Sequence, residues 1–166
     1  RKLAKMGLQP LFWRAPTDND AGIQREWRSW NLDKLTYRLD RFGADVQGDA
    51  VVLEVEERVA PPVHGWGIRC RQLLRIDPQG SMNVDCEVDA SECPTMLPRV
   101  GLLLSLPREL DRADWYGLGP GEAYPDACLA ARLGRWKRTV DDLQTPHAFP
   151  QENGNRGEVR WLRMTD

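Results

Sequence analysis

The hydrophobic positions of this chain recur mainly with a period of two, which is the spacing of β-strands that bury one face. Val51, Leu53 and Val55 stand at every second position with Glu54 and Glu56 between them, and a second alternating run covers residues 68–76. The turn at residues 77–80 has Pro second and Gly fourth, and it leads into a third alternating run over residues 82–88. The two runs that flank this turn predict an antiparallel hairpin.

One stretch near the start has a helical period instead. Ile23, Trp27 and Trp30 stand at positions i, i+4 and i+7, with polar residues between them. This spacing predicts one short helix near residues 22–32 with a buried stripe. Asp20 precedes the stripe, and we expect its carboxylate to cap the helix by accepting from the free N–H groups of the first turn.

Four further segments are expected to be strands. Residues 100–106 are apolar on both faces, which predicts a central strand covered on both sides. Residues 111–115 form a shorter strand, and the basic run 132–140 is typical of an exposed edge strand. Residues 158–164 alternate again, and we expect this last strand to need a partner from outside the sequence.

These elements define the fold class. About seven or eight strands, one helix and a turn signal roughly every ten residues predict an all-β protein, a large antiparallel β-sandwich. Strands and helices do not alternate as a parallel sheet would require. The 166 residues begin with Arg1 instead of Met, so we expect an excised part of a longer protein.

Composition excludes several classes of function. The chain is 41% hydrophobic and 29% charged, and its net charge of -2 arises from interspersed signs, which argues against nucleic-acid and polybasic membrane surfaces. No apolar run is long enough to span a bilayer. The cysteines lack the spacing of a metal site and are expected to be reduced thiols; a disulfide between the two hairpin cysteines is conceivable. They are Cys70, Cys86, Cys93 and Cys128.

Two irregular stretches, residues 115–126 and 145–156, concentrate Gly, Pro and aromatic side chains. Their glycines superficially match a phosphate-binding loop. Pro120 removes an N–H that such a loop would use, and Pro125 argues against a helix starting there, so we exclude dinucleotide binding.

The candidate chemistry of these stretches rests on carboxylates and histidines. Glu122 and Glu152 could form the carboxylate pair that retaining glycoside hydrolysis requires, or each could accept backbone N–H groups in a structural turn. His64 and His147 could each act as a general base, but no nucleophile motif accompanies them, and packed or surface positions are favoured.

A calcium loop at Asp18-Asn19-Asp20 is disfavoured, because Gly22 and Ser29 occupy positions that should carry ligands. The sequence therefore predicts no metal site in this chain.

Three segments, in this order, resemble those of a known family. They are Phe12-Trp13-Arg14-Ala15-Pro16-Thr17-Asp18-Asn19-Asp20, then Trp115-Tyr116-Gly117-Leu118-Gly119-Pro120-Gly121-Glu122-Ala123-Tyr124-Pro125-Asp126, then Phe149-Pro150-Gln151-Glu152-Asn153-Gly154. They look like the C-terminal small-chain domain (domain 5) of bacterial β-galactosidases, glycoside hydrolase family 2. The resemblance spans essentially the whole chain.

The resemblance implies a supersandwich fold like that of galactose mutarotases, of which residues 1–166 would be the N-terminal part. It implies that the two catalytic glutamates and the Mg2+ and Na+ ligands lie in other domains, chiefly a TIM barrel, so no catalytic residue, metal site or cofactor is expected here. Ala123 and Ala127 stand where the family usually has Asn and Arg, which removes hydrogen bonds expected to tie the loop down.

The function implied is a non-catalytic segment of an enzyme that hydrolyses terminal β-D-galactosides, contributing to the active-site wall, domain packing and carbohydrate binding. Its partners would be the TIM barrel and other domains of the same polypeptide, in a homo-oligomer of the bacterial cytoplasm, without nucleic acid or membrane. Two alternatives stay open: a freestanding carbohydrate-binding module, and a mutarotase-like epimerase that pairs a histidine with a carboxylate in a pocket.

The expected site residues fall into two groups. We expect four residues to organise loops at an interface or on the substrate side: Glu122, Tyr124, Glu152 and Asn153. We expect three residues to be structural: Arg14, Asp18 and Asp20.

Overall fold

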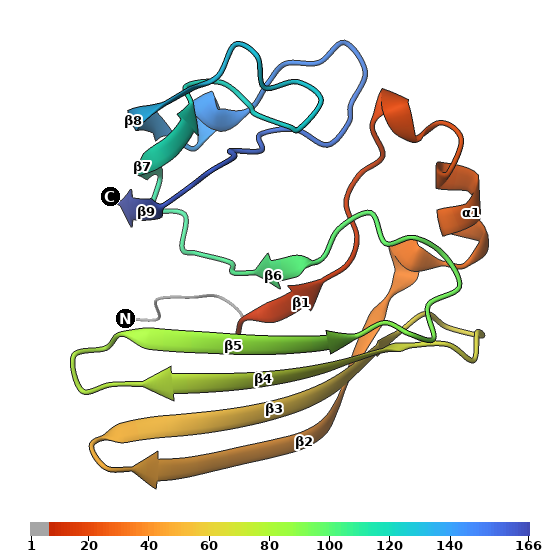
Figure 1. Cartoon of the computed structure of the whole chain (residues 1–166), viewed down its shortest axis with the longest axis vertical. Coiled ribbons are helices and arrows are strands. Elements are labelled where there is room, and N and C mark those ends of the chain that lie inside the picture. The colour runs from red at the N-terminus through yellow and green to blue at the C-terminus, as the bar shows by residue number, and fades with distance from the viewer. Residues whose placement is uncertain (1–6) are drawn as a thin grey trace. The chain divides into compact units, whose positions relative to one another are not determined.

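Strands dominate the computed structural model, which describes residues 7–166 (Figure 1). Strands make up 42% of the described residues and helices 9%, and the sheets are antiparallel. The predicted all-β class is therefore confirmed, and the antiparallel sheets agree with a sandwich. The chain divides into two compact units. We call residues 10–13 and 20–101 the four-stranded unit, and the other, mainly residues 14–19 and 102–166, the three-stranded unit.

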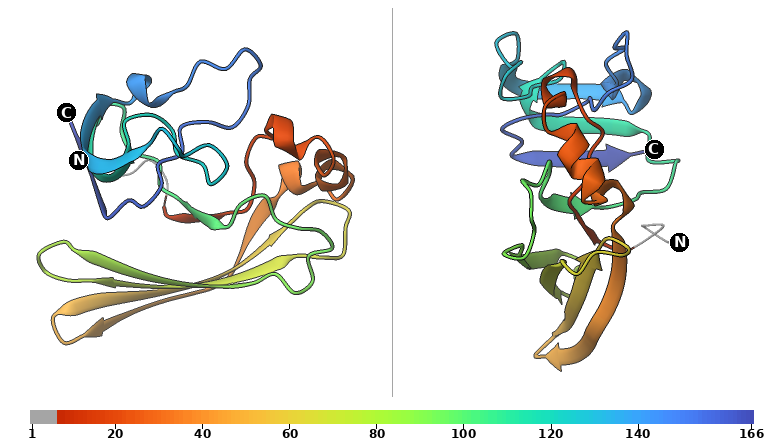
Figure 2. Two further views of the ribbon diagram at one scale, coloured as in Figure 1. Left: turned by 45° about the horizontal axis from the view of Figure 1, so that its top comes forward. Right: turned by 90° about the vertical axis from the view of Figure 1, so that its right-hand side faces the viewer.

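The four-stranded unit contains one antiparallel sheet in the order β2-β3-β4-β5 (Figure 2). The strands are β2 (Thr36–Gln47), β3 (Ala50–Ala60), β4 (Ile68–Ile76) and β5 (Met82–Asp89). Each of the three alternating runs of the sequence is one of these strands.

Tight turns fix the register of this sheet. Gly48 and Gly80 have φ values of 69° and 85°, in the left-handed region that favours glycine. The Gly80 N–H donates to the Asp77 carbonyl at 3.0 Å, so the predicted turn and hairpin are confirmed. Cys70 and Cys86 lie on one face in diagonal positions, and all four cysteines are free thiols.

The two faces of this sheet differ in chemistry. Three residues at one end of the apolar face, Val59, Ile68 and Cys70, pack into the core with residues from outside the sheet: Phe12, Trp27, Leu32 and Trp66. Toward the hairpin turns, the same face is exposed, as at Phe42 and Val46. The opposite face is charged and carries ion pairs between arginines and glutamates of neighbouring strands.

The predicted helix is confirmed as α1 (Gln24–Ser29), with Trp27 buried in the core and Ile23 and Trp30 packed against it. The predicted cap is wrong. Asp20 belongs to the 3-10 helix η1 (Asp18–Asp20), and a turn separates it from α1, so Ile23 takes the cap position without a side-chain hydrogen bond. The Asp20 backbone carbonyl accepts from the Ile23 N–H at 3.0 Å instead.

Two further 3-10 helices are short: η2 (Leu32–Lys34) and η3 (Asp141–Leu143). None of the helices that the structure describes is long and apolar enough to cross a membrane.

The three-stranded unit contains β7 (Arg112–Gly119), β8 (Arg132–Thr139) and β9 (Trp161–Thr165), in the order β8-β7-β9. The basic strand β8 lies at an edge, as predicted. Two expectations are corrected. β9 pairs with β7 of this chain, so it does not need an outside partner to form, and β7 extends four residues beyond Trp115, into the glycine-rich stretch.

The predicted central strand at residues 100–106 is also wrong. Only β6 (Gly101–Leu103) forms, and it pairs with β1 (Gln9–Leu11) in a two-stranded sheet. Leu102, Leu103 and Leu104 are 41%, 38% and 47% exposed. Prolines on both sides of the segment lack a backbone N–H and limit the length of the ladder.

Candidate functional site

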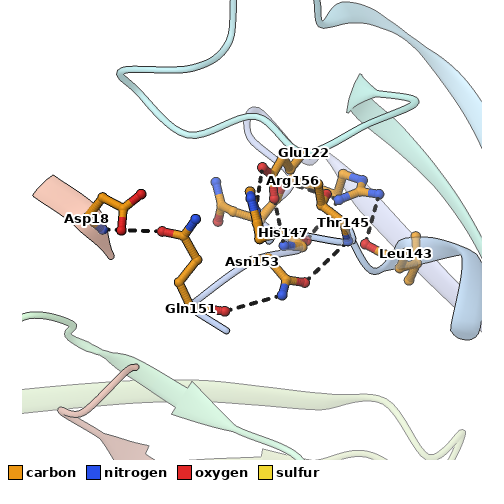
Figure 3. A network of polar contacts seen from close by, with 10 residues as sticks. Asp18, Glu122, Leu143, Thr145, His147, Gln151, Asn153 and Arg156 are labelled. Carbon is orange, nitrogen blue, oxygen red and sulfur yellow. Dashed lines mark hydrogen bonds and ion pairs between the residues drawn. The ribbon is translucent and has the colours of Figure 1, made fainter. Parts of the chain in front are cut away.

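Three segments of the three-stranded unit meet through hydrogen bonds and contain most of the predicted site residues (Figure 3). They are residues 14–18, 120–126 and 145–156, and we call them together the loop cluster. The second and third segments are the irregular stretches that the sequence singled out. The cluster does not include Asp20, which belongs to the other unit.

Glu122 joins the second and third segments. Its Oε1 lies 3.2 Å from His147 Nε2, and its Oε2 accepts a hydrogen bond from the Gly154 N–H at 3.2 Å. Both side chains are largely buried, with 18% of Glu122 and 26% of His147 exposed. Gly154 has a φ of 83°, so the backbone that presents this N–H to the carboxylate favours glycine.

Two hydrogen bonds between Ala123 and Asn155 hold the same two segments together beside Glu122. The Ala123 N–H donates to the Asn155 carbonyl at 2.8 Å, and Asn155 Nδ2 donates to the Ala123 carbonyl at 2.7 Å. Asn19 Nδ2 also donates to the Asp126 carboxylate at 2.7 Å. Ala123 and Ala127 cannot make the side-chain hydrogen bonds of Asn and Arg, and amides from other segments hold this loop at Ala123 and Asp126.

The third segment is also tied to the first. Asp18 N–H donates to Gln151 Oε1 at 3.2 Å, and Ala15 N–H donates to Glu152 Oε2 at 3.3 Å. Asn153 acts locally: its Nδ2 donates to the Gln151 carbonyl at 3.3 Å, and its Oδ1 accepts from Thr145 N–H at 3.5 Å.

Arg14 also bonds locally, through Nη1, to the Ala15 carbonyl at 3.1 Å. Arg14 and Asp18 thus both lie in a segment held by the residues around Glu152.

Arg156 is a residue of the cluster that the sequence did not single out. Its Nη1 donates to the Gly154 carbonyl at 3.0 Å, its Nη2 donates to the Leu143 carbonyl at 3.4 Å, and its guanidinium lies 5.4 Å from the buried Trp115 ring. Burial lowers the pKa of Arg156, while the nearby Glu122 and Tyr124 act in the opposite direction. The Tyr124 hydroxyl oxygen is itself buried.

The glycines before the cluster allow close packing. A Cβ at Gly117 would lie 2.9 Å from the Val159 Cα, and one at Gly119 would lie 2.7 Å from the Trp136 ring. Trp136 Nε1 donates to the Gly117 carbonyl at 3.2 Å. These glycines therefore bring β7 close to its neighbours, a packing role that needs no bound phosphate.

The arrangement is suited to structure more than to chemistry. Glu122 and Glu152 each accept a backbone N–H of this chain, from different segments. Among residues 7–166, no cluster of three His, Cys, Asp or Glu side chains could hold a metal ion. His64 belongs to the other unit, where its ring lies 5.4 Å from that of Trp30. His147, in contrast, contacts the Glu122 carboxylate.

Comparison with known proteins gives a family. The family model described as "Beta galactosidase small chain" matches residues 1–166. A protein of Pectobacterium atrosepticum named "Beta-galactosidase" is 39% identical over 166 residues, which cover 93% of this chain. Proteins of the same name from Vibrio cholerae and Oenococcus oeni are 33% and 32% identical, each over 95% of this chain. The chain spans 16% of the length of each of these relatives.

Proposed function

Because this chain belongs to the beta galactosidase small chain family, we propose that it is a non-catalytic β-sandwich segment of a bacterial β-galactosidase. The observation that carries this proposal is the match of nearly the whole chain to a small part of proteins named beta-galactosidase. Residues 1–166 would then be part of the small-chain domain, and the parent would hydrolyse terminal β-D-galactosides.

The loop cluster would serve as a rigid wall or interface beside the active site. Glu122 and Asn153 hold the long third segment, Glu152 attaches it to the first, and the half-buried Tyr124 lies near enough to Arg156 to affect its pKa. Arg14 and Asp18 would fix the first segment, and Asp20 the entry to the helix. A loop that is already ordered costs less entropy when it contacts a substrate or a domain.

The chemistry would take place in other domains. Retaining hydrolysis needs two carboxylates at about 5–5.5 Å across the scissile bond. Glu122 and Glu152 support a structural role instead, since both already accept hydrogen bonds from this chain. A TIM barrel of the same polypeptide would supply the catalytic glutamates, with Mg2+ and Na+ bound outside this chain, in a homo-oligomer of the bacterial cytoplasm.

Hydrolysis of nitrophenyl β-galactoside tests this proposal. We expect the parent to cleave it with retention and the 166-residue chain to be inactive; cleavage by the chain alone would contradict the assignment. In the parent, Glu122→Gln should lower kcat/KM, because the amide keeps only one of the two carboxylate oxygens that contact His147 and the Gly154 N–H, whereas Glu109→Gln on an exposed loop should not. Isothermal titration with galactose and lactose tests the alternative of a carbohydrate-binding module, since binding by the chain alone would favour it.

The contact between His147 and Glu122 favours one second candidate, a mutarotase-like epimerase. A histidine oriented by a carboxylate is a reasonable general base for the opening of a sugar ring. In that case the chain would accelerate interconversion of galactose anomers, measured by polarimetry, and His147→Gln would abolish the acceleration while His64→Gln would not. Equal rates with and without the chain would reject this candidate.

A further inference from the structure

One face of the three-stranded sheet is strongly basic. Opposed residues on antiparallel strands point to the same face, so the register of β8, β7 and β9 places nine side chains together in three rows. The rows are Arg135, Tyr116 and Trp161; Lys137, Asp114 and Arg163; and Thr139, Arg112 and Thr165. We call these nine residues the basic face. The opposite face of β7 buries Ala113 and Trp115, each 2% exposed.

A groove of about 510 Å³ lies over this face. Its lining includes four cations and one carboxylate of the basic face, together with Arg138 and Asp142 from outside the face, although the chain as a whole has a net charge of -2. Positive charge is therefore concentrated here against the overall balance of the chain, and such a concentration attracts anionic groups.

The carboxylate inside the face does not neutralise it. Asp114 is 14% exposed and accepts from Arg135 Nε at 3.0 Å and Nη2 at 2.6 Å, with Lys137 Nζ at 3.7 Å. The hydrogen bond from Arg135 holds the pKa of Asp114 below its usual range, and Lys137 and Arg163 add to this effect. The Asp114 carboxylate thus interacts with three cations, Arg135, Lys137 and Arg163. The side chains of Lys137 and Arg112 are 71% and 70% exposed.

The composition of the basic face indicates what kind of partner it fits. Arg, Tyr and Trp are the residues that protein interfaces favour and that most often dominate binding energy. Tyr116 and Trp161 are 37% and 43% exposed, and the Arg135 guanidinium lies 5.5 Å from the Trp161 ring centroid. Exposed aromatic side chains held beside arginines are suited to packing against another protein surface, and the excess cations require that surface to carry carboxylates.

We propose that the basic face docks an acidic surface of a neighbouring domain of the parent polypeptide. This inference rests on the proposed function, because it requires a parent with further domains, and the relatives are long enough to contain them. The docked carboxylates pair with Lys137 and Arg163, whose charges Asp114 leaves in excess, and with Arg112, whose Nε lies 4.0 Å from the exposed Asp111.

Zero-length cross-linking of the full-length parent with a carbodiimide tests this docking, because the reagent joins a lysine amine only to a carboxylate in direct contact. Lys137 lies in the middle row of the face, on the edge strand β8, and the exposed Lys34 of the other unit is a matched control. We expect Lys137 to be joined to an Asp or Glu outside residues 1–166 of the same polypeptide, with a yield that falls as salt is raised.

Three results would overturn the proposal. Lys137 could be joined only to Asp114, which lies within reach; it could be joined to a second copy, giving a species of twice the mass; or its yield could equal that of Lys34. Arg163→Glu should lower the cross-link yield of Lys137 at least about tenfold, because like charges oppose docking. Arg75→Glu, on the four-stranded sheet, should leave it unchanged. Galactosidase activity is assayed separately, so a failure of the proposed function is distinguishable from a failure of docking.

Discussion

Replacing Glu57 with Gln is expected to stabilise the four-stranded unit at pH 7. Glu57 lies on β3, on the apolar face of the sheet, where the Gln72 side chain of β4 donates to its Oε2 from Nε2 at 3.1 Å. Gln72 is 2% exposed, and its Oε1 is buried without a hydrogen-bond partner. Gln at position 57 would supply an N–H to this oxygen, still accept from Gln72, and remove a partly buried charge.

The magnitude follows from these groups. A buried polar atom without a partner costs about 1–3 kcal/mol, and we expect a gain near the lower end, about 1 kcal/mol, because Glu57 itself is only partly buried. Burial raises the pKa of Glu57, and the hydrogen bond from Gln72 opposes this shift only in part. A raised carboxyl pKa means that the native state loses stability as pH rises from below the unfolded pKa through the folded one. The advantage of Gln is therefore full at pH 7, shrinks as pH falls through the raised folded pKa, and is smallest below about pH 4, near the unfolded pKa.

Urea unfolding followed by tryptophan fluorescence measures this difference, since Trp27 and Trp66 lie in the core of the same unit. With a denaturant slope of about 2 kcal/mol/M, the midpoint should rise by roughly 0.5 M. The matched control is Glu56→Gln on the opposite face, where the Glu56 carboxylate lies 3.4 Å from Arg41 and is 38% exposed. We expect this variant to lose at most about 0.5 kcal/mol of unfolding free energy. The reasoning would be refuted if Glu57→Gln were no more stable than the wild type at pH 7, or if its advantage were as large at pH 3.

Two further predictions concern packing and thiol chemistry. Gly117→Ala should destabilise the three-stranded unit by about 1–3 kcal/mol, because its Cβ would lie 2.9 Å from the Val159 backbone. Gly121→Ala is the control, since a Cβ there meets no atom within 4 Å. Equal urea midpoints for the two variants would contradict this prediction. Burial raises the pKa of the Cys70 thiol to about 12. At pH 8, iodoacetamide should therefore alkylate Cys70 roughly a thousandfold more slowly in the native chain than in urea, as measured by mass spectrometry of the Cys70 peptide. Comparable rates would show that the Cys70 thiol is accessible in the native chain.

Local patterns predicted the elements whose partners are nearby in the sequence. The hairpin of residues 68–89 is determined by alternation and by a turn with Pro and Gly at defined positions, and both are visible without tertiary information. Residues 100–106 failed for the opposite reason. An apolar run indicates that both faces of a strand can be buried, but it does not indicate which elements would cover them, because that depends on tertiary structure. Among the described strands, β6 pairs only with β1.

The candidate site was predictable in its segments but not in its contacts. Gly, Pro and aromatic content identified the stretches around Glu122 and Glu152, yet nothing local indicated that Glu122 contacts His147 or that the Asn155 amide donates to the Ala123 carbonyl. Arg156 escaped notice because arginines are common in this sequence, and what distinguishes this one is burial against Trp115. Its position two residues after the left-handed Gly154 was the available signal.

The long strands of the four-stranded sheet imply a gradient of protection against hydrogen exchange. One end of each central strand is covered by the core at Val59 and Ile68, whereas the other end, near the hairpin turns, carries exposed apolar side chains such as Val51. Identical ladder hydrogen bonds therefore differ in how often they open, because local opening at the turn end breaks few buried contacts. Amides of residues 51–53 should exchange with deuterium well before those of residues 58–60, although both belong to β3.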